Sequence, residues 1–246
     1  MIEKLSGLGA FLKSEKVNNC FVDTTILFSA SYHLDSFNSA AESAFDELSS
    51  LKVAVFTNIN VRAEFLENHR RVLIAECLID FLQDFESKID VALALKLQSH
   101  RTSYRRKLDE EKSAKMDVNQ IRNFRKLLTA FHSPEGNGWE IFCDSYLNRK
   151  IQKIWPNTDQ QLGLNFISLR SGDDSPYLNS IPEWEQATNL VGRYGIASND
   201  AMILNMFLCS KIPVLLTADL EMATVADQES KGVKNIFIPD SVFLGK

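Results

Sequence analysis

The sequence predicts an α/β protein, with a central parallel sheet between layers of helices and an additional helical segment. Short runs rich in valine, isoleucine, phenylalanine and threonine alternate with stretches of helical periodicity, and strands that are separated by helices pair in parallel. The four predicted strands cover residues 20–22, 53–57, 213–217 and 234–238. A chain of 246 residues is long enough for one large domain or two small ones.

The first half of the chain contains two of the predicted strands. Residues 1–16 have the pattern of a short amphipathic helix, and the apolar run at Cys20 is interrupted by Asp23 before it continues as TTILFSA, typical of a strand that passes into a helix. VAVFT at 53–57 is the second strand, and Asn58 and Asn60 are candidate N-caps of a long helix after it. That helix is expected to carry an apolar stripe at spacings of three and four, formed by Leu78, Leu82, Phe85, Ile89 and Leu93.

The second half is richer in predicted helices. One is expected at about 114–131, ended by Pro134 and the glycines after it, and WEIFCDSYLNRKIQKIW is compatible with another. NTDQQLG and SGDDSPYLNSIP have the composition of loops. Helices at 183–194 and 199–210 precede the strand at 213–217, and a short helix at 221–230 follows it.

Composition and motifs exclude several classes of protein. A net charge of −5 gives no overall basic signal, so binding to nucleic acid needs a local patch. The start, MIEKLSGLGAFLKSEK, has no apolar region of a signal peptide, and no run is long enough to span a membrane. There is no GxSxG, P-loop or GxGxxG sequence. The cysteines lie far apart in apolar contexts, which predicts reduced, buried thiols in a cytoplasmic protein rather than a zinc site: Cys20, Cys77, Cys143 and Cys209.

Four acids follow the ends of strands or begin the helices after them. Asp23 ends the first strand, and Asp219 follows the strand VLLTA. Glu64 is expected in the first turn of the long helix, and Asp200 in the first turn of a helix that Ser198 would cap. Because the carboxyl ends of parallel strands meet at one edge of a sheet, and the following helices begin there, we expect the four carboxylates to lie close together.

Each acid also has a structural explanation of its own. Asp200 and Glu64 could favour the positive end of a helix dipole, at about 0.3–1 kcal/mol each, and Asp219 could begin a turn. Asp23 is harder to explain, because apolar residues flank it and a buried carboxylate must be paired or bind a metal. Four converging acids without an adjacent Lys or Arg would repel one another, whereas Mg²⁺ or Mn²⁺ prefers such hard oxygen ligands. The combination therefore predicts a metal site.

These residues resemble a PIN domain, the metal-dependent ribonuclease fold of many toxin–antitoxin nucleases and RNA-processing enzymes. The resemblance depends on VDTTILFSA (22–30), NVRAEF (60–65), IASNDAMILNMFLCSKIPVLLTADLEM (196–222) and KNIFIP (234–239). Its most specific part is the helix that opens with an acid, followed by a strand and a T-x-D sequence. The segment 66–180 lies outside the resemblance.

The resemblance implies a PIN-like three-layer α/β/α fold and a Mg²⁺- or Mn²⁺-dependent endoribonuclease. It also implies a single domain, 1–246, with its core at about 17–65 and 183–246 and a helical insertion or elaboration at about 66–182. Asp23, Asp200 and Asp219 would be direct or water-bridged metal ligands, and Glu64 would complete the site or orient the attacking water. All four would be catalytic, because a metal-activated water hydrolyses the phosphodiester and leaves a 5′-phosphate and a 3′-hydroxyl. Thr217 and Ser198 would position the acids or bind a phosphate oxygen, and Glu221 is a further acid beside them.

A basic stretch is the candidate for holding the substrate. Residues 96–126 carry ten basic and four acidic residues, a net charge of +6, whereas the rest of the chain has −11. SHRTSYRRK at 99–107 adds an aromatic ring to the charges, which suits single-stranded RNA. A solvated helix face of mixed charge is the alternative. The candidate substrate-binding residues are Arg70, Arg71, Arg101, Tyr104, Arg105, Arg106 and Lys107.

Two other functions share the same acids. One is a catalytically silent PIN-like module that binds RNA or protein, and the other is a DNA-directed flap-type nuclease, which would ordinarily bring more acids and a helical element that grips DNA. The resemblance also allows an antitoxin or another protein regulator, and a homodimer, as partners besides the RNA substrate. No membrane partner is expected.

Overall fold

The computed structural model describes residues 1–167 and 175–244, and the chain divides into two compact units. The first unit, Met1–Phe65 with Thr158–Lys246, contains the sheet, and the second unit, Leu66–Asn157, is mainly helical. The second unit ends at Asn157 rather than near 182, because part of 158–182 supplies a strand to the sheet. The loop predicted at 171–182 lies partly outside the described residues.

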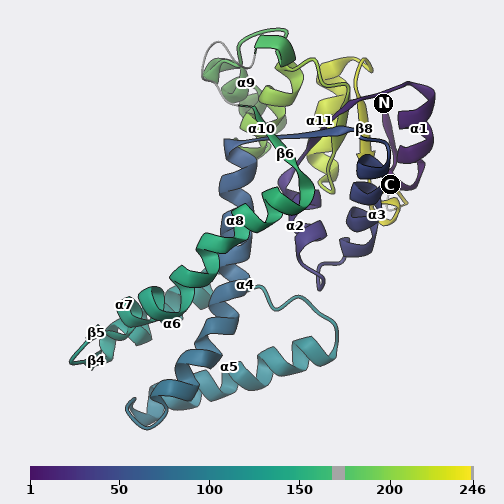
Figure 1. The fold of residues 1–246 in the computed structure, drawn as a ribbon. Helices are drawn as coiled ribbons and strands as arrows, with labels where there is room; N and C mark the ends of the chain where they lie inside the picture. The colour runs from purple at the N-terminus through teal and green to yellow at the C-terminus, as the bar shows by residue number, and fades with distance from the viewer. Residues whose placement is uncertain (168–174, 245–246) are drawn as a thin grey trace. The chain divides into compact units, whose positions relative to one another are not determined.

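The first unit is built on a six-stranded sheet in which every pair of neighbouring strands is parallel (Figure 1). The strand order is β1-β8-β7-β2-β3-β6. The strands are β1 (Ile2–Lys4), β2 (Asn19–Val22), β3 (Ala54–Asn58), β6 (Leu164–Ile167), β7 (Val214–Leu216) and β8 (Asn235–Ile238). The predicted α/β class and central parallel sheet are confirmed, and each of the four predicted strands is present.

The helices of the first unit fall into two groups. Helix α3 contacts both α1 and α2, and α10 contacts both α9 and α11. The sheet and these two groups are compatible with a three-layer α/β/α arrangement. The helices are α1 (Leu8–Ser14), α2 (Thr24–Ser31), α3 (Asn38–Ser50), α9 (Trp184–Tyr194), α10 (Ser198–Cys209), α11 (Leu220–Ser230) and α12 (Asp240–Phe243).

The prediction is wrong for both edges of the sheet. Residues 1–16 form β1, a 3₁₀ turn at Leu5–Gly7 and then α1, so the predicted helix begins only at Leu8. Ile2–Lys4 are extended because they pair with β8, far along the chain. NTDQQLG, predicted as a loop, continues α8, and the strand β6 that follows it pairs with β3. Both edge strands depend on distant partners, which a local pattern does not reveal.

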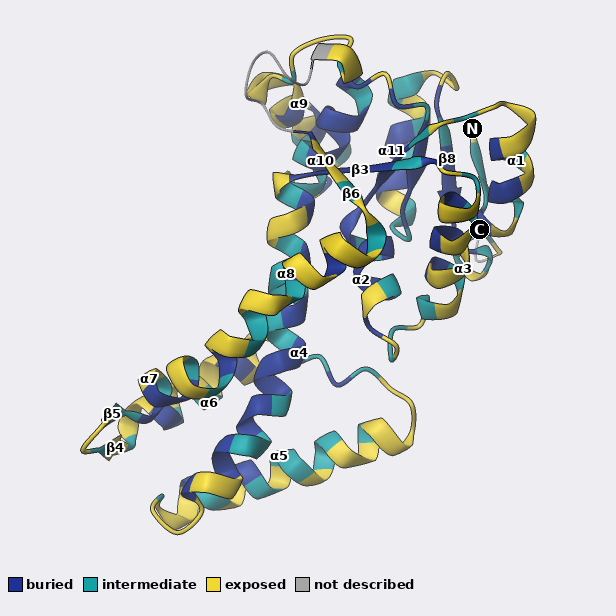
Figure 2. Cartoon of the chain, viewed as in Figure 1, coloured by how far each residue is buried: buried dark blue, intermediate teal, exposed yellow. Residues whose placement is uncertain are grey.

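The residues of the central strands of the sheet are buried (Figure 2). Phe21, Val22, Leu215 and Leu216 in the central strands are fully buried, as expected for parallel strands covered on both faces. The four cysteines are free thiols, three of them buried and Cys143 partly buried. In the described part of the chain, no helix combines the length and apolar character that crossing a membrane requires.

The second unit has its own aromatic and aliphatic core. Leu78, Leu82, Phe85 and Leu93 belong to it, and Ile89 packs against it, but they do not share one helix as predicted. The long helix ends at Phe85, and the Asp90 side chain caps the next helix by accepting a hydrogen bond from the Leu93 amide (2.9 Å). The elements that build this unit are α4 (Ile59–Phe85), α5 (Val91–Asp109), α6 (Val118–Ala130), β4 (His132–Ser133), β5 (Gly136–Asn137), α7 (Gly138–Phe142), a π-helical turn (Cys143–Leu147) and α8 (Asn148–Leu162).

Candidate metal centre

The two central strands deliver Asp23 and Thr217 to the same edge of the sheet. In the parallel pair β2 and β7, Val22 is opposite Leu216, and the Asp23 amide donates to the Leu216 carbonyl (2.9 Å). The next residue of each strand, Asp23 and Thr217, therefore lies at the carboxyl end of the sheet. The expected position of Asp23, directly after its strand and before a helix, is confirmed because Asp23 is the N-cap of α2.

The Asp23 carboxylate is buried and held by hydroxyl groups. Only 1% of Asp23 is exposed. Its Oδ2 accepts hydrogen bonds from the Thr217 hydroxyl (2.9 Å), the Thr25 hydroxyl (2.8 Å) and the Thr25 amide (3.4 Å). These donors fix the carboxylate but bring no positive charge, so the cost of burying the charge is only partly offset.

Thr217 links Asp23 to Asp219. While its hydroxyl donates to Asp23, the same oxygen accepts a hydrogen bond from the Asp219 amide (3.0 Å). The Asp219 side chain then caps α11, where its Oδ1 accepts from the Met222 amide (2.9 Å). Asp219 is thus both a helix cap and a carboxylate at the sheet edge, and one role does not exclude the other.

Glu64 reaches the same edge from α4, but not from its first turn. The helix begins at Ile59, two residues earlier than a cap at Asn60 would place it, because the Asn58 side chain caps it by accepting from the Val61 amide (3.0 Å). Glu64 Oε2 accepts hydrogen bonds from the side-chain amide of Asn199 (2.7 Å) and from the Thr24 hydroxyl (3.2 Å). Thr24 directly follows Asp23, so Glu64 lies beside the Asp23 loop.

Asp200 comes from the first turn of α10, as predicted. Ser198, however, is not the N-cap: the helix starts at Ser198, and its cap is Ala197, which offers no side-chain hydrogen bond. Burial, together with the charges of Glu64, Asp23, Asp219 and Glu221, raises the pKa of Asp200 from 3.8 to about 7. The acids are therefore electrostatic neighbours.

The pKa of Asp23 is raised in the same way. Burial and, to a smaller extent, the charge of Glu64 raise it, the hydrogen bonds from Thr25 and Thr217 lower it, and the net result is a rise from 3.8 to about 6. Two neighbouring carboxylates, Asp23 and Asp200, whose pKa values are raised by burial and by nearby acids are typical of a functional site.

These shifts predict how stability depends on pH without metal. Between about pH 4 and 7 the folded chain binds more protons than the unfolded chain, because the folded pKa values of Asp23 and Asp200 lie above the unfolded ones. The free energy of unfolding should therefore decrease as the pH rises through this window, by an amount on the order of 2–3 kcal/mol for Asp23 alone. Urea unfolding with a chelator present, repeated at successive pH values, measures the free energy of unfolding. In Asp23→Asn this free energy should decrease less steeply as the pH rises. An equally steep decrease in that variant would contradict this assignment.

The donor set fits a hard divalent cation. All the ligand atoms offered by Asp23, Glu64, Asp200 and Asp219 are carboxylate oxygens, which suits Mg²⁺ or Mn²⁺. Within 1–167 and 175–244, no three His, Cys, Asp or Glu side chains are grouped closely enough to hold a metal ion.

The predicted substrate-binding residues all belong to the second unit. Arg70 forms a two-bond ion pair with Glu67 (2.7 Å for each bond), and Arg71 Nε donates to the Met116 carbonyl (2.6 Å). These two guanidinium groups therefore have structural partners, which weakens their prediction as phosphate contacts. The remaining candidates lie on α5, where Arg105 and Arg106 are exposed and the others are partly exposed: Arg101, Tyr104 and Lys107.

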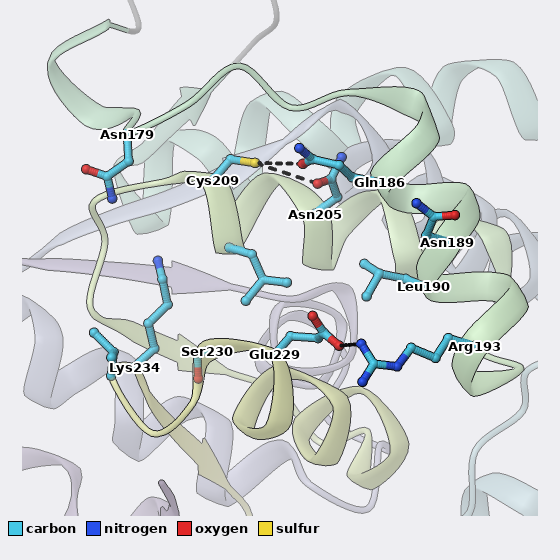
Figure 3. Close-up of a pocket in the computed structure, with 12 residues that line it drawn as sticks. Asn179, Gln186, Asn189, Leu190, Arg193, Asn205, Cys209, Glu229, Ser230 and Lys234 are labelled. Carbon is cyan, nitrogen blue, oxygen red and sulfur yellow. Dashed lines mark hydrogen bonds and ion pairs between the residues drawn. The ribbon is translucent and has the colours of Figure 1, made fainter.

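A cavity of about 630 Å³ in the first unit contains none of the four acids (Figure 3). Its charged groups already have partners: Arg193 pairs with Glu229 (2.8 Å), and Lys234 Nζ donates to three main-chain carbonyls at the end of α10 (2.7–2.9 Å). The thiol of Cys209 donates to Gln186. Despite its volume, this cavity brings together no set of unpaired charges, and the acid cluster remains the stronger candidate.

Of the neutral residues that hold the acids, the sequence predicts Thr217, whose hydroxyl donates to Asp23, but not Thr25 or Asn199. Thr25 binds Asp23, and its hydroxyl also accepts from the Ala218 amide (2.8 Å), which ties the α2 and α11 loops together. Asn199 binds Glu64, and Asn60, predicted as a cap, instead donates to Asn199 (3.0 Å). Their only sequence signal is adjacency to Asp23 and Asp200.

Comparison with known proteins gives no match: no family model, curated protein or solved structure matches this chain.

Proposed function

We propose that this chain is a Mg²⁺- or Mn²⁺-dependent endoribonuclease of the PIN type. The observation that carries the proposal is the convergence of Asp23, Glu64, Asp200 and Asp219 at the carboxyl edge of one parallel sheet, where their charges act on one another. The sequence resemblance to PIN domains supports the choice of RNA, and the basic residues of α5 suit the phosphate backbone of a nucleic acid.

The proposed reaction is hydrolysis of an RNA phosphodiester. The oxygen of a water molecule forms a bond to phosphorus and the bond from phosphorus to O3′ breaks, so that the products carry a 5′-phosphate and a 3′-hydroxyl. A divalent cation held by Asp23, Glu64, Asp200 and Asp219 would lower the pKa of a bound water and neutralise charge on the phosphate. The protein contributes the carboxylates, which the hydroxyls of Thr25 and Thr217 and the amide of Asn199 hold in place.

The direct test is cleavage of a labelled single-stranded RNA by the full chain. Cleavage is expected with Mn²⁺ or Mg²⁺, none with chelator, and the products should carry 5′-phosphates. Calorimetric titration with Mn²⁺ should show binding. Absence of both cleavage and Mn²⁺ binding would overturn the proposal in favour of a silent binding module, and preferential cleavage of flap DNA would favour the flap-type nuclease.

A further inference from the structure

Three large apolar side chains that the first unit leaves exposed meet at one cavity. Trp184 at the start of α9 is 69% exposed, Ile59 at the start of α4 is 58% exposed, and Phe166 on β6 is 39% exposed. They line a cavity of about 630 Å³, here named the Trp184 cavity. Apolar side chains that are exposed together, rather than singly, indicate a binding surface.

The Trp184 cavity is joined to the acid cluster by two amide side chains. Asn60, on its wall, donates to Asn199 Oδ1 (3.0 Å), and Asn199 donates to Glu64 Oε2 (2.7 Å). A smaller cavity of about 300 Å³ is lined by both asparagines and by Trp184. A group held against Trp184 is therefore connected to Glu64 through this pair of amides.

We propose that the Trp184 cavity binds an unpaired base of single-stranded RNA, beside the phosphodiester that lies at the acids. This inference rests on the proposed nuclease function and names a subsite for its substrate. Every base has an aromatic face that stacks on side chains such as Trp184 and Phe166. A base inside a duplex presents no free face, so the subsite selects single strands.

The polar groups of the wall favour a nucleotide over an apolar helix of a protein partner. The Glu183 carboxylate and the Asn60 carbonyl are acceptors for the amino groups of a base, and Arg62 brings a guanidinium group for a neighbouring phosphate. A groove for an amphipathic helix would instead present a row of apolar pockets.

The test uses the fluorescence of Trp184 in the full-length Asp219→Asn chain, with chelator present so that the RNA stays intact. The chain has three tryptophans, and the other two, Trp139 and Trp155, lie in the second unit and are less exposed. A short single-stranded RNA should quench the emission, and Trp184→Leu should remove most of the quenching and weaken binding about tenfold. Trp184→Phe keeps an aromatic face, so its affinity for the RNA should stay within about threefold of that of the Asp219→Asn chain. Val233→Ala, at an exposed apolar residue outside this cavity, is the matched control and should change neither the quenching nor the affinity for RNA.

In otherwise wild-type protein, Trp184→Leu should raise KM for RNA and leave kcat unchanged, because stacking binds substrate and transition state alike. If the chain cleaves RNA, but Trp184→Leu changes neither KM nor RNA affinity nor the quenching, the subsite is overturned and the nuclease proposal stays intact. Quenching that depends on Trp184 in a chain that cleaves nothing would support the subsite and overturn the nuclease. A change in oligomeric state on Trp184→Leu, with RNA affinity unchanged, would show that the face joins two copies of the chain and would overturn the inference.

Discussion

Replacing Asp219 or Asp23 with asparagine is expected to lower the rate of metal-dependent RNA cleavage by roughly a thousandfold. Both residues stand at the carboxyl edge of the two central strands and are linked through the Thr217 hydroxyl. Asparagine keeps the shape of the side chain but removes a negative charge, and its amide nitrogen is not a metal ligand. The affinity for Mn²⁺ should fall with the activity.

The fold should survive both substitutions. Asparagine at 23 can still accept the hydrogen bonds of Thr25 and Thr217, and it removes a buried charge whose pKa the fold raises to about 6. At pH 8 without metal, the Asp23→Asn chain should therefore be at least as stable as the wild type. Asparagine at 219 can still cap α11, because asparagine and aspartate are comparable N-caps.

The measurements are cleavage rate, Mn²⁺ calorimetry and urea unfolding on the same preparations. Asp46→Asn, on the exposed face of α3, is the matched control, since it removes one carboxylate away from the cluster and should alter none of the three. Glu221→Gln removes an exposed acid that still influences Asp200, so a smaller loss of activity is expected there. Wild-type activity in either Asp23→Asn or Asp219→Asn would remove the acids from the mechanism.

The convergence of the acids could be anticipated because it depends on short-range relations. Asp23 and Asp219 each stand beside their own strand, and parallel strands necessarily bring their carboxyl ends to one edge. The position of Asp200 could be predicted because it requires only that the start of its own helix be recognised. Glu64 was placed at the correct end of α4 but in the wrong turn, because the choice between Asn58 and Asn60 as the cap moves the helix start. Helix boundaries are the least certain part of a sequence prediction.

Apart from Thr217, the neutral partners of the acids could not be anticipated in the same way. An asparagine next to an acid, such as Asn199, has no pattern that separates a ligand-holding amide from a solvated one. Its role depends on Glu64, 135 residues away in the chain. The ion pair of Arg70 with Glu67 could be predicted from the sequence, because residues three apart on a helix are neighbours. This ion pair argues against Arg70 as a free guanidinium for phosphate binding. The exposed position of Trp184 beside Asn60 requires the folded chain.

A second large effect is expected in the second unit, where Phe81→Ala should lower the free energy of unfolding by about 3–5 kcal/mol. Phe81 is fully buried, its ring stacks on Phe85 at 4.7 Å, and it meets the rings of Phe131, Phe142 and Tyr146 edge-on at 5.8–6.4 Å. Removing it leaves a cavity at the centre of these contacts. The loss should fall mainly on 66–157, since this segment forms its own compact unit.

The four acids belong to the first unit, so the Phe81→Ala chain should still bind Mn²⁺, whereas its affinity for RNA should decrease if α5 contributes its basic residues to binding. Hydrogen exchange resolved by segment would show faster exchange in 66–157 than in the sheet, and calorimetry would show an unchanged affinity for Mn²⁺. Val91→Ala, at an exposed apolar residue of the same unit, should cost less than about 0.5 kcal/mol and change neither property. Equal acceleration of exchange in both units, or loss of Mn²⁺ binding, would mean that the sheet depends on the helical unit for its stability, and that the metal site cannot be assigned to the first unit alone.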